Sequence, residues 1–517
     1  MNRGSLFSKT LIVIILSIVS VFLLSSCAES SRSSGLAYEK REDGYWVVGI
    51  GTNAGGKVVV PATYEGEAVV GIAAGAFNPF TQLDLTGKRI YSIRIGENVQ
   101  TIEDSAFYGN SWLETVELLG SGVSIGNEAF YGCSNLESVN VAGDVAVIGD
   151  SAFAYCEKLS SFDFKEGLQQ IGTSAFYSCS TLTGLTLPES LVNIGMDAFS
   201  QCAAVKSLTF SSAITVIPEG AFRGLTGLNA LIIPETVTEI GSGAFDELTN
   251  LKTLTIPKSV QKMDYCFNSD WAIEEVHYGG SFEDWLAIEM SNVASSPFYY
   301  SSSAKLYLNG VLLEGDIVIP EGITRIGNHA FENYRYITSV SFPHDMEYIG
   351  DYAFSGCLGL SGVSFAGDVA AFGNHTFSGC ENITNIDLGN DLTKTGYYMF
   401  ADGCTIQKLV IPSNVKQIDN GSFARCDVKE LVISEGVERI HSEAFENINI
   451  AIHIPKSVKV IQFSAFATKH EISYSGTVAD WASVEAHHLW NEHYAEFVVH
   501  CADGDVTIPH PYEQYGS

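Results

Sequence analysis

The chain has 517 residues, and 46% of them are apolar, a share that excludes disorder over most of its length. Its 60 acidic and 28 basic residues give a formal net charge of −32. Such a surface repels phosphate backbones, so nucleic acid is not an expected partner. This length would ordinarily mean about three or four globular domains, but internal repetition overrides that expectation.

The first 27 residues have the pattern of a targeting segment. Arg3 and Lys9 precede an apolar stretch over residues 11–24, and small residues lead to Cys27. This resembles a bacterial lipoprotein signal, which predicts lipidation of Cys27 and anchorage on the outer side of a bacterial membrane. An ordinary cleaved signal peptide or an uncleaved anchor are the alternatives, although the apolar run is short for a spanning helix.

The next two segments lead into the repeats. Residues 28–35 are polar and predict a flexible tether. Residues 36–72 are predicted to form an N-terminal cap with the first strand, because Asp43-Gly44 between two apolar stretches is typical of a hairpin.

Sixteen phenylalanines close a repeated unit that is usually written Ile-Gly-x-x-Ala-Phe. The units from Phe107 to Phe245, and again from Phe331 to Phe423, are 23 residues apart. A fixed period of this length predicts a solenoid, because each coil can bury its apolar face only against its neighbours. The phenylalanines are Phe77, Phe107, Phe130, Phe153, Phe176, Phe199, Phe222, Phe245, Phe267, Phe331, Phe354, Phe377, Phe400, Phe423, Phe445 and Phe466. We expect nine coils in repeat block 1, residues 73–267, and seven in repeat block 2, residues 321–466.

One coil, residues 182–202, shows how the unit is expected to fold. The alternation Leu-Thr-Leu at 185–187 predicts a short strand with its threonine outward. Leu191 and Ile194 are expected to point back into the coil. Residues 197–199 are then predicted to begin a helical or 3₁₀ turn that places the phenylalanine at the base of the coil.

A glycine precedes this turn in nine of the units, and Pro218 stands at the same position in another. Because proline cannot take a positive φ, the position does not require a left-handed conformation. Residues 218–221 are therefore interpreted as a proline at the first position of a helical turn.

These units resemble the BspA-type leucine-rich repeats of bacterial surface proteins, whose pattern is L-x-x-V-x-I-P-x-x-V-x-x-I-G-x-x-A-F-x-x-C. The resemblance covers about residues 60–466. It implies a repeat solenoid with a parallel β-sheet along one face and short helical or 3₁₀ turns and loops on the other. Family members are often surface-attached, and characterised ones act as adhesins for host matrix proteins or other cells.

Eight of the ten cysteines after Cys27 form a column. Seven of them lie three residues after a repeat phenylalanine, and Cys404 lies one residue further on. The column lacks the spacing of zinc ligands. We expect these cysteines to fill the core as small apolar residues, with disulfides between neighbouring coils as the alternative.

An insert, residues 268–320, interrupts the repeats. Its sequence Tyr-Gly-Gly-Ser-Phe-Glu-Asp-Trp285 recurs in outline as Tyr-Ser-Gly-Thr-Val-Ala-Asp-Trp481. The second copy lies in residues 467–517 and is expected to cap the last coil. A carbohydrate or partner site at the two tryptophans is the alternative.

The chain offers little evidence of catalysis. Ser124 lies in a G-x-S-x-G pattern, but it stands just before the repeat isoleucine, where no strand-to-helix elbow is expected. The histidines near the C-terminus lack the i, i+4 spacing of a helical metal pair, so solvated side chains are expected and a metal site is the alternative. They are His470, His487, His488, His493, His500 and His510. We expect no catalytic residue, no metal and no cofactor, and predict that the chain is not an enzyme.

The outward positions of the repeat strands carry mostly small hydroxyl and amide side chains, with scattered acids. Such a face suits a broad, wet protein contact better than a catalytic cleft; a plain solvated face is the alternative. The candidate binding residues are Thr115, Glu117, Ser138, Asn140, Ser161, Asp163, Thr186, Ser207, Thr209, Thr253 and Thr255.

From these observations we predict a lipid-anchored cell-surface protein that recognises an extracellular protein, such as a host matrix protein, or another cell. A glycan-binding protein that uses the tryptophan-bearing inserts and a structural protein of the cell envelope are the alternatives.

Overall fold

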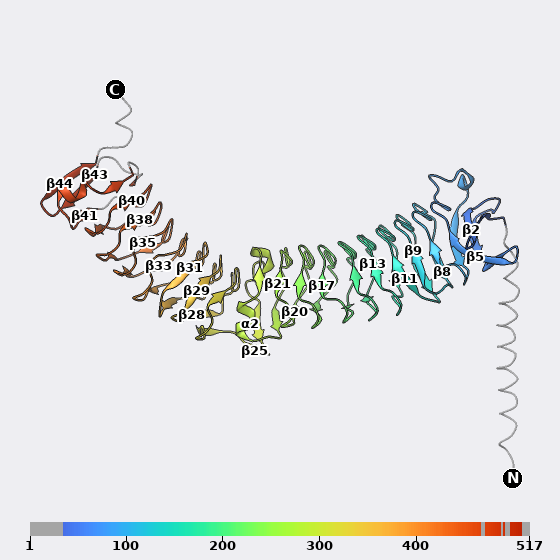
Figure 1. Cartoon of the computed structure of the whole chain (residues 1–517), viewed down its shortest axis with the longest axis horizontal. Coiled ribbons are helices and arrows are strands. Elements are labelled where there is room, and N and C mark those ends of the chain that lie inside the picture. Colours follow the sequence, from blue (N-terminus) through green and yellow to red (C-terminus); the bar gives the residue numbers. More distant parts are fainter. Residues whose placement is uncertain (1–34, 467–470, 488–489, 492–496, 509–517) are drawn as a thin grey trace, which may run out of the picture. The chain divides into compact units, whose positions relative to one another are not determined.

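The computed structural model describes residues 35–466, 471–487, 490–491 and 497–508 (Figure 1). The chain divides into two compact units: unit 1 contains residues 1–214 and 218–228, and unit 2 contains residues 215–217 and 229–517. The boundary falls inside the predicted repeat block 1. The predicted lipidation site Cys27 and the signal segment lie outside the described residues.

Each coil of unit 1 contributes a strand to a first set of parallel strands, the one expected from the sequence. Its sheet is ordered β12-β10-β8-β6-β3, and β14 and β16 form a separate parallel pair at the same repeat position. The strands are β3 (Gly56–Val60), β6 (Ile90–Ile95), β8 (Thr115–Leu118), β10 (Ser138–Val141), β12 (Ser161–Phe162), β14 (Leu185–Thr186) and β16 (Leu208–Thr209).

A second sheet runs through unit 1, and the sequence analysis did not predict it. Its strands are mostly two to four residues long and end on the repeat isoleucine, too short to show an alternating pattern. They are β5 (Glu67–Ile72), β7 (Thr101–Ile102), β9 (Val123–Ile125), β11 (Val145–Ile148), β13 (Gln170–Ile171) and β15 (Asn193–Ile194). Each coil therefore presents two strand-bearing sides.

The predicted N-terminal hairpin is present and extends this second sheet. Strands β1 (Ala37–Arg41) and β2 (Gly44–Gly49) are antiparallel, and β2 lies parallel to β5. Arg41 pairs with Gly44, so the loop is Glu42–Asp43, one residue earlier than predicted. The short strand β4 (Thr63–Tyr64) pairs antiparallel with β5, and a 3₁₀ helix, η1, covers Leu83–Leu85.

The core of unit 1 is a single row of buried phenylalanine rings. Phe130 and Phe153 stack with ring centroids 5.0 Å apart, and Phe153 and Phe176 follow at 5.2 Å. The row extends from Phe77 to Phe222, with each of these side chains fully buried. The predicted stacking of coils is therefore confirmed in this unit.

The turn that carries the phenylalanine is not helical, which corrects one prediction. Ser151 and Tyr155, two residues before and after Phe153, both have positive φ, near 53° and 61°. With these two left-handed residues on either side of Phe153, the amides of Ser151, Phe153 and Tyr155 all donate to carbonyls of the next coil, at 2.7–2.8 Å. A left-handed residue costs about 1–2 kcal/mol, and the gained hydrogen bonds offset that cost. The turn at 218–221 is likewise not helical, because Gly220 has a positive φ of 62°.

The conspicuous glycine column has a different cause. Gly149 and Gly172 do not have positive φ, as the proline at position 218 had indicated. A Cβ at Gly149 would lie 2.7 Å from the carbonyl carbon of Gly126, and one at Gly172 would lie 2.6 Å from that of Gly149. Glycine is required because the backbones of neighbouring coils approach closely.

The repeat cysteines are buried and unoxidised, as expected. The Cys156 thiol donates to the carbonyl of Phe130 at 3.3 Å, and Cys179 does the same to Phe153 at 3.2 Å. Asn110 fills the same position in an earlier coil, and its amide reaches the Phe77 carbonyl. The column therefore supplies a hydrogen-bond donor as well as apolar volume.

Unit 2 repeats this architecture in shorter sheets. The sheets at the position of the first set are β18-β20-β22-β24-β25, β26-β28-β30-β32, β34-β37 and β39-β41-β43-β44; those at the second position are β17-β19-β21-β23, β27-β29-β31 and β35-β38-β40-β42. A further pair is β33-β36. The bounds are β17 (Val216–Ile217), β18 (Ala230–Ile232), β19 (Glu239–Ile240), β20 (Thr253–Ile256), β21 (Lys262–Met263), β26 (Gly315–Val318), β27 (Arg325–Ile326), β28 (Ile337–Phe342), β29 (Met346–Ile349), β30 (Gly362–Phe365), β31 (Val369–Phe372), β32 (Asn385–Asp387), β33 (Thr405–Ile406), β34 (Leu409–Ile411), β35 (Gln417–Ile418), β36 (Asp427–Val428), β37 (Leu431–Ile433), β38 (Arg439–Ile440), β39 (Ile452–Ile454) and β40 (Val460–Ile461).

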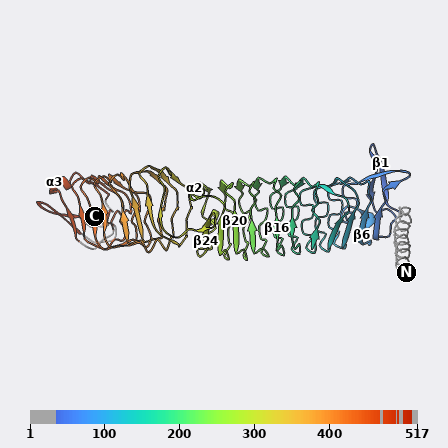
Figure 2. The same cartoon turned by 90° about the horizontal axis from the view of Figure 1, so that it is seen from below.

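The insert and the C-terminal segment share one design, as the sequence indicated; Figure 2 labels the short helix of each, α2 and α3. Each has a strand, a short helix with a capping box, a two-residue strand and an antiparallel hairpin. The insert contains β22 (Glu275–Tyr278), α2 (Phe282–Leu286), β23 (Glu289–Met290), η2 (Val293–Ser295), β24 (Lys305–Leu308) and β25 (Val311–Leu312). The C-terminal segment contains β41 (Ile472–Tyr474), α3 (Val478–Trp481), β42 (Glu485–Ala486), β43 (Phe497–Cys501) and β44 (Gly504–Ile508). No helix among the described residues is long and apolar enough to cross a membrane.

Candidate recognition surface

The predicted binding residues of unit 1 lie side by side on one surface. Thr115, Ser138 and Ser161 pair across β8, β10 and β12, so they form one row. Glu117 and Asn140 pair in a second row. All of these side chains are exposed or half-exposed, while the residues that alternate with them are buried. We call the outward side chains of β8, β10, β12, β14 and β16, with Asp163 and Ser207 beside them, the strand face.

A shallow hollow of about 440 Å³ lies on the strand face. Four of its side chains are predicted binding residues. It is lined by Glu117, Val139, Asn140, Val141, Ala142, Ser161, Phe162 and Asp163. The two carboxylates are partly compensated, because Arg94 lies 3.1 Å from Glu117 and Lys165 lies 3.7 Å from Asp163. The hollow therefore offers hydroxyl, amide and carboxylate groups to a polar ligand.

The strand face continues to the last coils of unit 1. Thr186 and Thr209 pair in register on β14 and β16, and both are exposed. Ser207 is exposed just before β16, and the absence of a side chain at Gly184 leaves space beside it. The three predicted residues in this part of the face carry hydroxyl groups and no charge.

The two remaining candidates belong to unit 2. Thr253 and Thr255 lie on β20, half-exposed. Thr255 pairs with Ile232 on one side and His277 on the other, and His277 stacks on Tyr307 with centroids 4.8 Å apart. The surface around these threonines is thus more apolar and aromatic than the hollow of unit 1, and the strand alternation alone did not reveal that.

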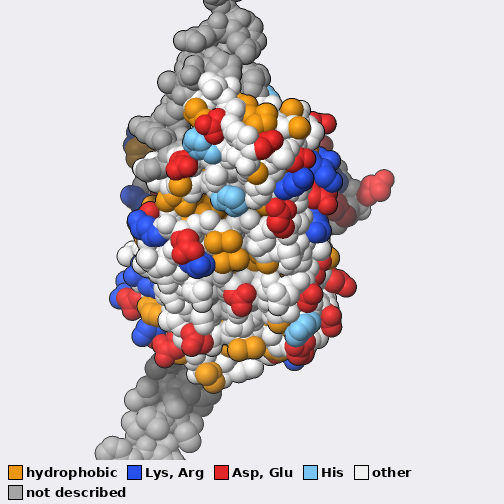
Figure 3. Space-filling view, turned by 90° about the vertical axis from the view of Figure 1, so that its left-hand side faces the viewer, with side chains coloured by type: hydrophobic (Ala, Val, Ile, Leu, Met, Phe, Trp, Pro, Cys, Tyr) orange, Lys and Arg blue, Asp and Glu red, His pale blue; other side chains and the backbone are white. Residues whose placement is uncertain are grey.

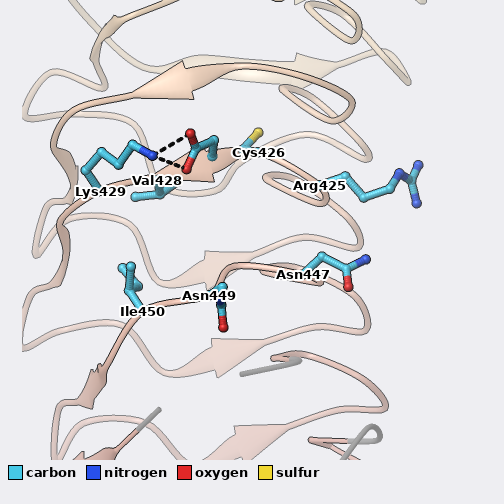
Figure 4. A pocket seen from close by; sticks show the side chains of 8 residues that line it. Arg425, Cys426, Val428, Lys429, Asn447, Asn449 and Ile450 are labelled. Carbon is cyan, nitrogen blue, oxygen red and sulfur yellow. Dashed lines mark hydrogen bonds and ion pairs between the residues drawn. The ribbon is translucent and has the colours of Figure 1, made fainter. Parts of the chain in front are cut away.

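A hollow in unit 2 is lined by paired charges. This hollow, about 430 Å³ and shown in Figure 4, is formed by residues 425–429 and by Asn447, Asn449 and Ile450. Lys429 lies 2.6 Å from Asp427, and Arg425 binds Asp402 at 2.6 Å. Figure 3 likewise shows acidic and basic side chains interspersed on the side of the molecule that holds the described C-terminal residues. No single-sign patch of a nucleic-acid type appears there.

The described residues hold no evident reaction centre. Ser124 lies inside β9 and pairs with Thr101, so the G-x-S-x-G pattern does not form a strand-to-helix elbow. No group of three or more His, Cys, Asp or Glu in the described part of the chain could hold a metal ion. His500 lies 2.9 Å from Asp505; His470, His488, His493 and His510 lie outside the described residues.

The alternative of a sugar or partner site at Trp285 and Trp481 is contradicted by the burial of both side chains. Trp285 is fully buried, and its indole N–H donates to the Ala330 carbonyl at 2.9 Å, where the next repeat block begins. Trp481 is only 6% exposed. Both rings pack inside the fold, so neither offers an open face to a ligand. Sequence reasoning overlooked Trp271, which is 61% exposed and lies 4.7 Å from the Tyr300 ring.

Comparison with known proteins identifies the family. The profile of the BspA-type leucine-rich repeat region (6 copies) matches residues 85–206, 146–274, 192–313, 307–429 and 394–478, together more than half of the chain. The chain belongs to the BspA-type leucine-rich repeat family. This confirms the resemblance and the solenoid fold predicted from the sequence.

Several solved structures are similar to the chain. A leucine-rich repeat protein from Bacteroides ovatus has 22% identity, covers 82% of this chain and 94% of its own, and has a TM-score of 0.46. A leucine-rich cell-surface protein from Faecalibacterium prausnitzii has 20% identity, 88% and 96% coverage and a TM-score of 0.31. The pneumococcal vaccine antigen PcpA has 16% identity, 87% and 96% coverage and a TM-score of 0.30. Likenesses at this level concern the repeat fold alone. No curated protein matches the chain.

Proposed function

We propose that this BspA-type protein is anchored to the outer side of a bacterial membrane through Cys27 and recognises an extracellular protein through the strand face. The observation that carries the proposal is the in-register rows of exposed small polar side chains on β8 to β16, with the hollow at Glu117 and Asp163. A broad, polar and hydrated surface of this kind suits a protein partner. The membership of a family of surface repeat proteins supports the location.

Host matrix proteins are the partner class to test first. We would measure binding of the purified protein to immobilised matrix proteins by surface plasmon resonance. Thr186→Lys, Ser207→Lys and Thr209→Lys place positive charge on the strand face. We expect each to weaken binding about tenfold, because an added charge must be desolvated without a partner.

The same coil provides a matched control. Asn193 is exposed on β15, in the second sheet, whereas Thr186 is exposed on β14. Asn193→Lys adds the same charge to the same coil and should leave binding unchanged. Equally weakened binding by Thr186→Lys and Asn193→Lys would mean that binding depends on net charge and not on the strand face. Unchanged binding by both variants would place the site elsewhere.

A second candidate function is glycan capture by the insert. Trp271, Tyr299 and Tyr300 form an exposed cluster, with Tyr299 and Tyr300 4.8 Å apart at nearly a right angle. Open aromatic faces of this kind can stack on sugar rings. On a glycan array, Trp271→Ala should abolish any signal that the unaltered protein gives, and Trp112→Ala, at another exposed tryptophan, should not. Absence of any glycan signal would remove this candidate.

A further inference from the structure

A second exposed feature of unit 1 lies away from the strand face. Five aromatic rings in successive coils form a continuous line, which we call the tyrosine strip: Phe80, Tyr108, Tyr131, Tyr155 and Tyr177. Phe80 is 76% exposed and Tyr155 is 40% exposed, and the other three are half-exposed. A continuous aromatic line on a soluble surface is typical of an interaction site.

The repeat places these rings in register. Tyr108, Tyr131 and Tyr177 directly follow the buried phenylalanine of their coil. Tyr155 follows its phenylalanine by two residues, and its amide donates to the Tyr177 carbonyl of the next coil at 2.8 Å. The strip therefore runs along the turns between the two sheets, and each side chain is held by a backbone that the coil stack fixes.

Tyr155 occupies a costly backbone position. Its φ is +61°, in the left-handed region that a bulky residue rarely adopts. The two preceding coils have Gly109 and Gly132 at this position. A tyrosine here is thus not needed for the fold, and its ring is available for binding.

The ring angles vary along the strip. Tyr108 and Tyr131 are parallel, 4.9 Å apart at 5°, so each covers a face of the other. Tyr155 is turned by 67° from Tyr131 and by 65° from Tyr177, at 5.3 Å and 5.4 Å, so these rings meet edge to face. Phe80 is likewise turned by 75° from Tyr108. The strip therefore presents a ridged aromatic surface, which suits the compact ring of a proline better than a flat sugar face.

The hydroxyl groups of the strip favour a ligand that accepts hydrogen bonds. The hydroxyls of Tyr108, Tyr131, Tyr155 and Tyr177 show no hydrogen bond to any other described residue. Tyrosine hydroxyls are protonated at neutral pH and can donate, and burial, followed by the neighbouring Tyr155, Tyr108 and Glu128, raises the pKa of Tyr131 further. A polyproline II chain makes no internal hydrogen bonds, so all its carbonyls are free to accept from such donors.

The spacing also fits. One turn of polyproline II contains three residues and advances about 9 Å. The two successive steps of 5.3 Å and 5.4 Å from Tyr131 to Tyr177 traverse a similar length. Prolines one turn apart would therefore lie over Tyr131 and Tyr177, with the residues between them against Tyr155, in the way that aromatic grooves recognise proline-rich segments.

Charge defines the partner further. Glu128 lies close enough to act on the Tyr131 hydroxyl, and its carboxylate accepts from the Ser105 hydroxyl at 3.3 Å. The formal charge of the whole chain is −32. We propose that the tyrosine strip binds a basic, proline-rich segment of a partner protein in the polyproline II conformation. This is a second interaction surface, and it does not depend on recognition by the strand face.

The test uses the full chain and labelled synthetic peptides. The probe is a twelve-residue peptide of repeated Pro-Pro-Lys, and the control peptide replaces proline by alternating Gly and Ser with the same number of lysines. Fluorescence anisotropy at moderate salt should show saturable binding of the first peptide and at least about tenfold weaker binding of the second.

Variants of Tyr155 locate the site. Tyr155→Gly restores the residue type of the two preceding coils, so the fold should be kept, and peptide binding should weaken about tenfold because the ring between Tyr131 and Tyr177 is lost. Tyr155→Phe keeps the ring and removes one donor, so binding should weaken about threefold. Tyr397→Ala, at a tyrosine of unit 2 that is 49% exposed, should bind normally.

Each alternative outcome would overturn the proposal. Equal binding of both peptides would show attraction by charge alone. No binding, or binding unaffected by Tyr155→Gly in a protein with unchanged circular dichroism, would show that the strip has another use. A glycan-array signal lost in Tyr155→Gly, without peptide binding, would assign the strip to sugars. Thr186→Lys should not affect peptide binding, which separates this result from the test of the strand face.

Discussion

Each unit has the same kind of core, a row of stacked phenylalanine rings. The two units differ in the repeat position at which they carry their other aromatic rings. In unit 1, tyrosines directly follow the repeat phenylalanine and form the exposed tyrosine strip. In unit 2, the same position holds small residues such as Ser355, Ser378 and Ala401. The rings there lie two residues before the phenylalanine, in a stacked column of His329, Tyr352, His375 and Tyr398 with centroids 4.9–5.4 Å apart.

The column of unit 2 is integrated into the fold. His329 is 5% exposed and lies 2.6 Å from Glu332, and the Tyr398 hydroxyl donates to Glu443. The strip of unit 1 lacks such contacts. The comparison indicates that the phenylalanine row fixes the stack, while neighbouring positions can change from structural to recognition use without altering the core.

The largest expected effect is that of removing a ring from the phenylalanine row, which each unit contains. Phe153→Ala in unit 1 and Phe377→Ala in unit 2 each remove a fully buried ring that stacks on two neighbours. Each should lower the free energy of unfolding by about 3–5 kcal/mol, measured by urea denaturation with hydrogen exchange to locate the unfolded coils. A loss of under about 1 kcal/mol in one unit would show that its row is not a core.

Glycine substitutions should have the next largest effect. A Cβ at Gly149 would lie 2.7 Å from the Gly126 carbonyl carbon, and one at Gly373 would lie 2.2 Å from the Asp351 amide. Gly149→Ala and Gly373→Ala should each cost about 1–3 kcal/mol, because the coils must move apart. Gly362→Ala is the control, since its nearest contact would be at 3.8 Å, and thermal denaturation should show it to be neutral.

The glycine column also shows which features the sequence could and could not reveal. The phenylalanine period predicted the stack, and strand alternation correctly placed Thr186 and Asn140 outward. The left-handed turn residues were missed because most are not glycine: Ser105 and Glu128 hold positive φ for the sake of hydrogen bonds between coils. Such hydrogen bonding depends on two neighbouring coils together and cannot be recognised in the sequence of a single repeat.

The candidate surfaces were predicted to a lesser extent. Glu117 and Asp163 could be assigned to the strand face, but their shared hollow depends on where β12 ends. The burial of Trp285 could not be read from its motif, because the indole donor is satisfied by a carbonyl 45 residues away. The tyrosines after Phe107, Phe130 and Phe176 recur at a fixed repeat position, a signal that could have indicated the strip.

The buried thiols predict an alkaline loss of stability in both units. Burial raises the pKa of Cys133 from 9.0 to about 12 and raises that of Cys380 well above its ordinary value. Because the folded pKa lies above the unfolded one, this stabilisation is complete below pH 9 and is lost as the pH rises toward 12. Urea midpoints under reducing conditions should fall above pH 9, and Cys133→Ser should fall less steeply. Equal slopes would contradict a buried neutral thiol.

The smallest effect should distinguish the units at acid pH. Burial, despite the nearby Asp402 and Asp351, lowers the pKa of His375, and Arg425 adds to the decrease. Since the folded pKa lies below the unfolded value of 6.5, this stabilisation is present above that pH and is lost as the pH falls. Hydrogen-exchange protection factors, which are corrected for the intrinsic exchange rate at each pH, should therefore fall around residues 352–398 on acidification. The coils of the tyrosine strip should not change through this residue, and His375→Tyr should remove the effect.

The central claim is that unit 1 recognises a protein through the side chains of its first set of strands. The most direct measurement compares recovery of extracellular proteins by the unaltered chain, by a Thr186→Lys/Thr209→Lys variant and by Asn193→Lys, using quantitative mass spectrometry. The account predicts that a specific partner is recovered by the unaltered chain and by Asn193→Lys, and is lost with the double variant. Recovery of that partner in equal amount by all three proteins would contradict it.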